Sequence, residues 1–269
     1  MSSRLQGVTI TLQKAWLILV VTLLYVPMAS VVLASLSDSR YMQFPHEEWT
    51  IEPYRQALAS YTTTTLHLTS FRIAFVVVLL SVIIATCSAL AFARYEWRGR
   101  SLFRRLLLLP IFFPQPVLGL ALLLYFSALG ITPDWRTAAF AHLIWIVPIV
   151  TLVISIRLYN YDVAQEEAAF DLGASRWQAF REVTLPVLLP GIVSGALFGF
   201  LMSWSNLPLS VFTSGADTTL PEWLFSRTAT NYSPLVPAVA VIATAISGAV
   251  ILVVGVAWKL ATPRAPATE

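Results

Sequence analysis

Long runs without a charged residue dominate the pattern of this chain. There are six, at residues 15–37, 73–93, 106–132, 137–156, 183–216 and 228–258. Each is long enough for a helix that crosses a bilayer, which needs about 20 apolar residues. We therefore predict an all-α membrane protein with six transmembrane helices. The last two runs exceed one span, and their ends, which carry proline and serine, are expected at the membrane surface.

The composition supports a membrane protein. Only 12% of the residues are charged and 57% are apolar. Soluble domains carry about 25% charged residues, so an ordinary soluble globule is excluded. The net charge of +3 includes no long block of like charge, so no nucleic acid is expected as a partner. The one cysteine, Cys87, excludes an intrachain disulfide and a zinc site made of cysteine pairs.

The first apolar run has two interpretations. Lys14 precedes it, and the small residues near Ser35 resemble the cleavage site of a signal peptide. The run is longer than a usual signal core of about 7 to 15 residues, so we predict a retained first span.

The basic residues predict the orientation of the chain. With six spans, 12 lysines and arginines fall on the side of the termini and 5 on the opposite side. Because basic residues are retained in the cytoplasm, both termini are expected to be cytoplasmic. The expected division is a cytoplasmic segment 1–14, a transmembrane domain 15–260 that includes an inner loop at 160–186, and a cytoplasmic tail 261–269.

Several local patterns lie between the spans. The external segment 38–70 contains Glu52-Pro53-Tyr54, which favours a short helix with proline in its first turn. Five arginines between residues 94 and 105 are interpreted as a topology anchor, with a site for lipid headgroups or a partner as the alternative.

Small residues and prolines mark other positions within the spans. A stripe of glycines at steps of four, Gly191, Gly195 and Gly199, lets another helix approach closely, either within the chain or at a subunit interface. Prolines at 110, 114, 116 and 148 interrupt the third and fourth runs and predict kinks there.

The chain carries no recognisable energy source or catalytic set. Its two lysines do not lie in a phosphate-binding GxxxxGK[ST] loop, and motifs such as HExxH and GxSxG are absent. The spans are nearly free of acidic and basic residues, which disfavours an ion-coupled transporter. His142 lies within the fourth run and is interpreted as a neutral histidine hydrogen-bonded to a neighbouring helix, with a place in a pathway as the alternative.

The inner loop is predicted to form two short helices. Asp162 with Gln165 matches a capping box at the start of the first helix, and Gly173 supplies a left-handed residue that ends it. Ser175 with Gln178 repeats the capping pattern for the second helix.

Each of these helices has an apolar face, one at Ala164, Ala168 and Leu172, the other at Trp177 and Phe180. Helices this short are marginal alone in water, so their faces need another surface. The loop either packs back on its own membrane domain or docks to a separate protein.

One spacing in this loop resembles a known family. Glu167-Ala168-Ala169, then Gly173, Val183 and Leu185-Pro186, is similar to the EAA signature of permease subunits of bacterial ABC importers, with Val183 where isoleucine is usual. The resemblance implies a type I importer permease fold in which this loop docks to an ATPase. Glu167, Ala168, Ala169 and Gly173 would form the docking helix and turn, and Leu185 and Pro186 would lead back into the membrane. Asp162 and Trp177 belong to the same expected coupling site.

Other residues resemble the spermidine/putrescine-type branch of these permeases. They are Arg98-Gly99-Arg100, Pro110, Pro114 and the stretch Asp171 to Ser175. Polyamine permeases tend to carry acidic residues in the fifth span, where this chain has Ser203-Trp204-Ser205-Asn206. This departure weakens the expectation of a multiply charged cation. Ser203, Trp204 and Asn206 are candidates for the translocation path, with an interhelical hydrogen bond or a surface-anchoring tryptophan as the alternative.

The resemblance implies a subunit that is not itself an enzyme and holds no cofactor. Its expected partners are a cytoplasmic ATPase dimer that binds ATP and Mg, a second permease subunit of a different chain, a periplasmic substrate-binding protein and membrane lipid. The expected location is the inner membrane of a bacterial cell, and the expected cargo is a small polar solute such as a polyamine or related amine. A stand-alone secondary transporter or channel is the alternative, and a membrane-bound enzyme is a third, which lacks a catalytic constellation.

Overall fold

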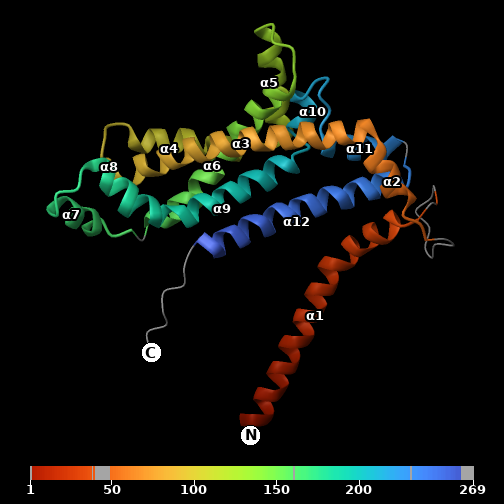
Figure 1. Ribbon diagram of the computed structural model, residues 1–269, viewed down its shortest axis with the longest axis horizontal. Coiled ribbons are helices and arrows are strands. Elements are labelled where there is room, and N and C mark those ends of the chain that lie inside the picture. Colours follow the sequence, from red (N-terminus) through yellow and green to blue (C-terminus); the bar gives the residue numbers. More distant parts are fainter. Residues whose placement is uncertain (1, 38, 40–48, 160, 231, 262–269) are drawn as a thin grey trace. The chain divides into compact units, whose positions relative to one another are not determined.

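The fold is helical throughout the part of the chain that the computed structural model describes, which is every residue except 1, 38, 40–48, 160, 231 and 262–269 (Figure 1). The expected tail beyond Ala261 lies outside the described residues. The helices are α1 (Ser2–Ser35), α2 (Glu52–Ala59), α3 (Tyr61–Arg94), α4 (Arg100–Leu108), α5 (Gln115–Ala128), α6 (Trp135–Tyr159), α7 (Ala164–Asp171), α8 (Arg176–Ala179), α9 (Leu185–Trp204), α10 (Ser210–Thr213), α11 (Leu220–Thr230) and α12 (Leu235–Ala261). A 3-10 turn, η1 (Leu109–Phe112), follows α4, and a π-helical turn, η2 (Phe180–Thr184), precedes α9.

Five of the six predicted spans are formed by helices long and apolar enough to cross a membrane. They are Leu12–Ser35, Tyr61–Phe92, Trp135–Tyr159, Arg176–Trp204 and Leu235–Ala261. The third run is different: Arg100–Phe112 and Gln115–Ala128 meet at an angle of 104°. The number of spans is therefore six only if this bent pair counts as one.

Proline explains the break in the third run. Pro110 lies within η1, Phe113 has an extended backbone, and Pro114 is the N-cap residue of α5. Proline has no N–H to donate and disfavours the helical conformation of the residue before it, so these prolines favour a break in the helix here. The predicted interruption is confirmed. Pro148, in contrast, lies inside α6, which remains one helix.

The last two apolar runs each contain more than one helix. The fifth run ends its long helix at Trp204 and continues into the four-residue α10. The sixth run includes the end of α11, which stops at Thr230, and most of α12, which begins at Leu235. The apolar length of these runs therefore exceeds what one spanning helix uses, as expected.

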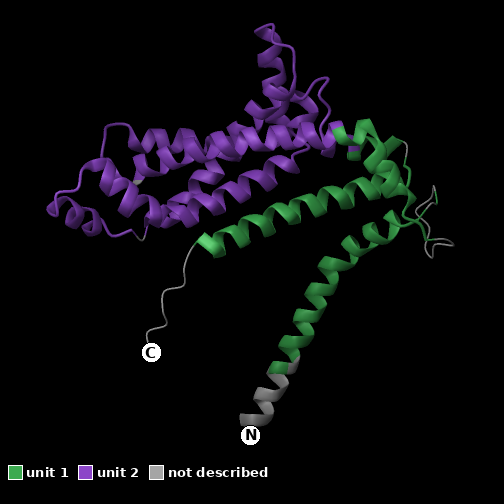
Figure 2. Cartoon of the chain, in the orientation of Figure 1, with its two compact units in different colours: residues 1–64, 224–269 green, residues 65–223 purple. Residues whose placement is uncertain are grey.

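The chain divides into two compact units, coloured separately in Figure 2. Unit 1 contains residues 1–64 and 224–269, and unit 2 contains residues 65–223. In unit 1, α2 has Pro53 in its first turn, which confirms the predicted short helix. The hydroxyl groups of Ser35 and Tyr54 lie 2.5 Å apart and join the end of α1 to α2.

The core of unit 2 is built from α3, α6 and α9. Its buried apolar residues include Val77 of α3, Ile146 and Val150 of α6, and Leu188 of α9. These helices pack closely because α9 turns its glycine stripe toward α6. A Cβ atom on Gly195 would lie 3.0 Å from the Cγ1 atom of Val150. The stripe is therefore an intrachain contact, which was one of its two interpretations.

Candidate functional site

The loop at residues 160–186 forms two short helices, as predicted, but its first helix begins later than expected. The N-cap residue of α7 is Val163, which has no capping side chain. The Oδ1 atom of Asp162 accepts a hydrogen bond from the backbone N–H of Ala164 at 3.0 Å, whereas Gln165 donates its N–H to the backbone carbonyl of Asp162. The predicted Asp162–Gln165 capping box is wrong, because Asp162 lies one residue outside the N-cap position.

The turn between the two helices matches the prediction. Gly173 has a φ of +85°, in the left-handed region that glycine adopts without steric cost. The N–H of Ala174 donates to the carbonyl of Ala169 at 3.0 Å, and the N–H of Gly173 donates to that of Phe170 at 2.9 Å. These bonds satisfy carbonyl groups at the end of α7. Gly173 therefore ends α7 and reverses the chain.

The second helix has the predicted capping box. The N–H of Gln178 donates to the Oγ atom of Ser175 at 3.3 Å, and the N–H of Ser175 donates to the Oε1 atom of Gln178 at 2.8 Å. After this one turn the chain widens into the π-helical η2, and Leu185 and Pro186 open α9. π-Helical turns occur often at functional sites. The second helix is thus continuous with the span that follows.

One side of the loop is exposed. Leu172 is 90% exposed and Trp177 is 67% exposed. Among the expected docking residues, Glu167, Ala168 and Gly173 are exposed as well, and Ala169 is half-buried. We call this exposed set, which comprises Glu167, Ala168, Leu172, Gly173 and Trp177, the outer side of the loop. Leu172 has no covering surface within the described part of the chain, whereas Trp177, although exposed, also lines a cavity on the inner side of the loop.

The opposite side of the loop packs back on unit 2 through polar groups that the sequence analysis missed. Glu166 is buried and forms an ion pair with Arg94 at the end of α3. The Tyr161 hydroxyl donates to the Oε1 atom of Glu166 at 2.6 Å, and the Thr184 hydroxyl donates to the same atom. The guanidinium of Arg94 also lies 5.6 Å from the centre of the Tyr161 ring. The interpretation that the loop packs back on its own membrane domain is therefore confirmed for one side of it. Docking of the exposed side to a separate protein stays a prediction.

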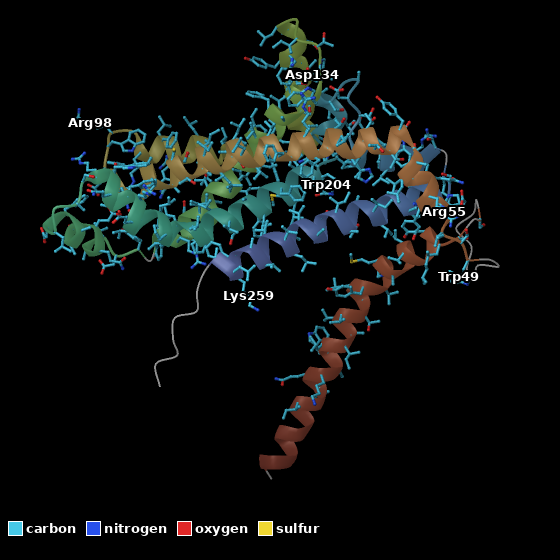
Figure 3. All side chains as sticks on the ribbon, in the orientation of Figure 1. Trp49, Arg55, Arg98, Asp134, Trp204 and Lys259 are labelled. Atoms are coloured by element: carbon cyan, nitrogen blue, oxygen red, sulfur yellow. The ribbon has the colours of Figure 1, made fainter. Side chains whose placement is uncertain are left out.

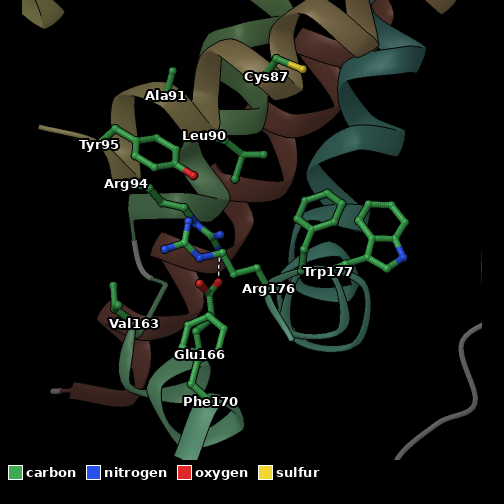
Figure 4. A pocket seen from close by; sticks show the side chains of 11 residues that line it. Cys87, Leu90, Ala91, Arg94, Tyr95, Val163, Glu166, Phe170, Arg176 and Trp177 are labelled. Carbon is green, nitrogen blue, oxygen red and sulfur yellow. Dashed lines mark ion pairs between the residues drawn. The ribbon is translucent and has the colours of Figure 1, made fainter. Parts of the chain in front are cut away.

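A cavity of about 700 Å³ separates the loop from the end of α3 (Figure 4). Cys87 and Arg94 line it from α3, and Phe170 and Trp177 line it from the loop. The rings of Trp177 and Phe180 stack at a centroid distance of 5.7 Å, so the second helix presents one aromatic face. The loop is therefore ordered by its own contacts without being densely packed against α3.

The three residues suggested for a translocation path all lie buried in unit 2. Ser203 is 4% exposed, and its hydroxyl hydrogen-bonds to the Nδ1 atom of His142 at 2.9 Å. The Oδ1 atom of Asn206 accepts from the N–H of Leu209 at 3.1 Å, and the ring of Trp204 stacks on Phe200. Ser203 thus makes an interhelical hydrogen bond, whereas Asn206 orders the chain before α10.

His142 connects three helices. Its Nε2 atom lies 3.1 Å from the hydroxyl of Ser210 in α10, while its Nδ1 atom contacts Ser203 in α9. The prediction of a histidine hydrogen-bonded to neighbouring helices is confirmed. The Ser210 hydroxyl also donates to the backbone carbonyl of Asn206 at 2.6 Å. His142, Ser203, Asn206 and Ser210 therefore form a buried polar cluster, which we call the His142 cluster.

Charged side chains of unit 2 occur at separate places. Figure 3 shows Arg98 and Asp134 well apart from each other, with Trp204 away from both. Next to Asp134 in the chain, Trp135 donates its N–H to the carboxylate of Asp217 at 3.0 Å. The guanidinium of Arg72 lies 3.6 Å from the centre of the Trp135 ring. Among the described residues, no group of three or more histidines, cysteines and acidic residues is placed to hold a metal ion.

Comparisons with known proteins agree with this architecture. The sequence profile of the family described as "Binding-protein-dependent transport system inner membrane component" matches residues 77–265. The putrescine transport system permease protein PotI of Escherichia coli is 34% identical over 252 residues, covering 91% of this chain and 88% of PotI. The spermidine/putrescine transport system permease protein PotC of Haemophilus influenzae is 32% identical over 243 residues, covering 90% of this chain and 94% of PotC.

A solved structure shares the fold. A chain of a bacterial ABC transporter involved in the import of the acidic polysaccharide alginate aligns with a TM-score of 0.65 and 19% identity, covering 97% of this chain and 98% of that chain. The family match includes the whole loop with its exposed outer side, as well as α6, α9 and α12. The chain is therefore a multi-pass membrane permease that belongs to the family of inner membrane components of binding-protein-dependent transport systems.

Proposed function

We propose that this permease is driven by a separate ATPase that binds the outer side of the loop. The supporting observation is the exposure of Leu172 and Trp177 on two helices that are otherwise ordered by caps and inward contacts. Exposed large apolar side chains on a rigid element are typical of a docking surface. The second helix of the loop continues directly through η2 into α9, so a force on that helix is transmitted to a span.

Copurification tests this docking. Leu172→Glu and Trp177→Glu place a charge where an apolar contact is expected, so each is expected to lower the yield of copurified ATPase at least tenfold. Leu58→Glu is the matched control, because Leu58 is 72% exposed on α2, outside the loop. Full retention of the ATPase by both loop variants would refute the docking site.

For the cargo, we propose a small amine, with polyamines as the first class to test. The support is the similarity to PotC and PotI, whose names state spermidine and putrescine. In the fifth span this chain has Ser203, Trp204 and Asn206 where polyamine permeases tend to carry carboxylates. Trp204 is 5% exposed and its ring stacks on Phe200, so it would contribute to recognition in a conformation that uncovers it. Cations bind favourably to aromatic faces within about 6 Å of the ring centre.

Uptake measurements test the path. Trp204→Ala and Asn206→Ala are compared with the unaltered permease in vesicles that hold the intact complex and radiolabelled putrescine. A loss of uptake at constant ATPase content is the expected result. Unchanged uptake by both variants would remove these residues from the path.

The remaining assembly follows from the same proposal. A second permease subunit of a different chain would complete the pathway, and a periplasmic substrate-binding protein would deliver the solute. Both termini would face the cytoplasm of a bacterial cell, with the permease in the inner membrane. ATP and Mg would bind to the ATPase dimer, and this chain would hold no cofactor.

A further inference from the structure

The inward attachment of the loop is made by charged groups that the proposed docking does not use. Glu166 follows the exposed Gln165 on α7, yet its side chain is only 11% exposed. Its partner Arg94 is the last residue of α3 and is 21% exposed. Figure 4 shows the two side chains pointing toward each other from different elements.

Two further groups complete the contact. The hydroxyls of Tyr161 and Thr184 both donate to the carboxylate of Glu166, and the Nη2 atom of Arg94 donates to the Oγ1 atom of Thr184 at 2.7 Å. Thr184 is the last residue of η2, directly before α9. The Glu166 carboxylate therefore joins α7 to α3 and to the beginning of α9. A charge this far from water needs such partners, because burial without them is strongly unfavourable.

Close apolar packing does not fill the space between α7 and α3. The cavity of about 700 Å³ lies between them, with Cys87, Phe170 and Trp177 in its wall. Side chains that face a cavity lack the dispersion contacts of close packing on that side. By backbone proximity α7 lies chiefly against α8 and η2, which belong to the same loop. The polar contact at Glu166 is therefore the main attachment of α7 to α3.

We propose that Arg94, Tyr161, Glu166 and Thr184 form a clamp that holds α7 in the orientation in which the outer side binds the ATPase. This inference rests on the proposed function. An ordered binding element loses less conformational entropy on association than a mobile one. The clamp residues are thus positioning residues: they affect the affinity for the ATPase through the orientation of α7, and the side chains of Arg94 and Glu166 are mostly buried.

The first measurement uses this chain alone in lipid nanodiscs. In Glu166→Gln and in Arg94→Met, the backbone amides of residues 165–172 are expected to exchange with solvent at least fivefold faster than in the unaltered chain. Glu182→Gln and Arg98→Met are matched controls, because each removes the same charge from an exposed neighbouring residue, and exchange in 165–172 should stay unchanged. Unaltered exchange in both clamp variants would overturn the proposal.

The second measurement is the dissociation constant of the ATPase. Arg94→Met and Glu166→Gln are each expected to raise it at least fivefold, and the double variant should match the weaker single variant within twofold, because both changes break one contact. Arg94→Lys keeps a cation opposite Glu166 and should bind within threefold of the unaltered chain. Multiplied losses in the double variant, or binding by Arg94→Lys as weak as by Arg94→Met, would contradict the clamp.

The two measurements separate the clamp from the proposed function. If the unaltered chain binds no ATPase, the proposed function fails, and amide exchange in the chain alone still decides whether the clamp orders α7. If the unaltered chain binds the ATPase and the clamp variants bind equally well, the clamp fails while docking stands.

Discussion

Replacing Gly173 isolates the contribution of the turn between α7 and α8. Its φ of +85° is left-handed, and a Cβ atom built there would meet no other atom within 4 Å. Gly173→Ala therefore introduces no clash, and its whole cost is that of a left-handed non-glycine residue, about 1–2 kcal/mol. Each 1.4 kcal/mol changes a dissociation constant by about a factor of ten. If the ATPase binds only the loop with this left-handed turn, its dissociation constant should therefore rise about 5- to 30-fold.

Two further variants refine this prediction. Asparagine tolerates the left-handed region better than alanine, so Gly173→Asn should lose less affinity. Gly255→Ala lies inside α12, where a Cβ atom also meets nothing, and it should leave binding unchanged. The assay is the dissociation constant of the ATPase for nanodisc-embedded chain. The reasoning is refuted if Gly173→Ala binds as tightly as the unaltered chain, or if asparagine is no better than alanine.

Three other variants, one of them with a matched control, test the packing and the polar contacts. Gly195→Ala should lower the free energy of unfolding by about 1–3 kcal/mol through overpacking against α6, whereas Gly248→Ala, with open space around it, should be neutral or stabilising in the same denaturation assay. His142→Leu removes the hydrogen-bond partner of Ser203 and should lower the free energy of unfolding by about 1–3 kcal/mol. Thermal unfolding measures this, and an unchanged midpoint temperature would contradict it. Ser175→Ala removes a cap and should destabilise the second loop helix by about 1 kcal/mol, seen as faster amide exchange confined to residues 176–179.

Local signals in the sequence predicted much of the fold and part of the site. Pro53 marks the first turn of α2, Gly173 ends α7, and Ser175 with Gln178 caps α8. Each signal depends on residues within a few positions of one another, so it can be read without knowing the fold. The beginning of α7 was placed too early because Asp162 matches a cap by residue type, while the backbone places Val163 at that position.

Contacts between distant segments could not be predicted in this way. Arg94 and Thr184 are 90 positions apart in the chain, and only the packing of α3 against α9 brings them together. The EAA spacing singles out Glu167, whereas no local signal in the sequence indicates that the adjacent Glu166 is buried. Their difference in burial arises from the face of α7 that meets unit 2. Similarly, the prolines predicted a break in the third run, but not the 104° between its two parts.

The dependence of transport on an ATPase tests the central claim most directly. Proteoliposomes would contain this chain with its second permease, its ATPase and its binding protein, and the uptake of radiolabelled putrescine and spermidine would be followed with and without ATP. The account predicts accumulation against a gradient only when the ATPase and ATP are both present. Accumulation against a gradient by vesicles that contain this chain without any ATPase would contradict it.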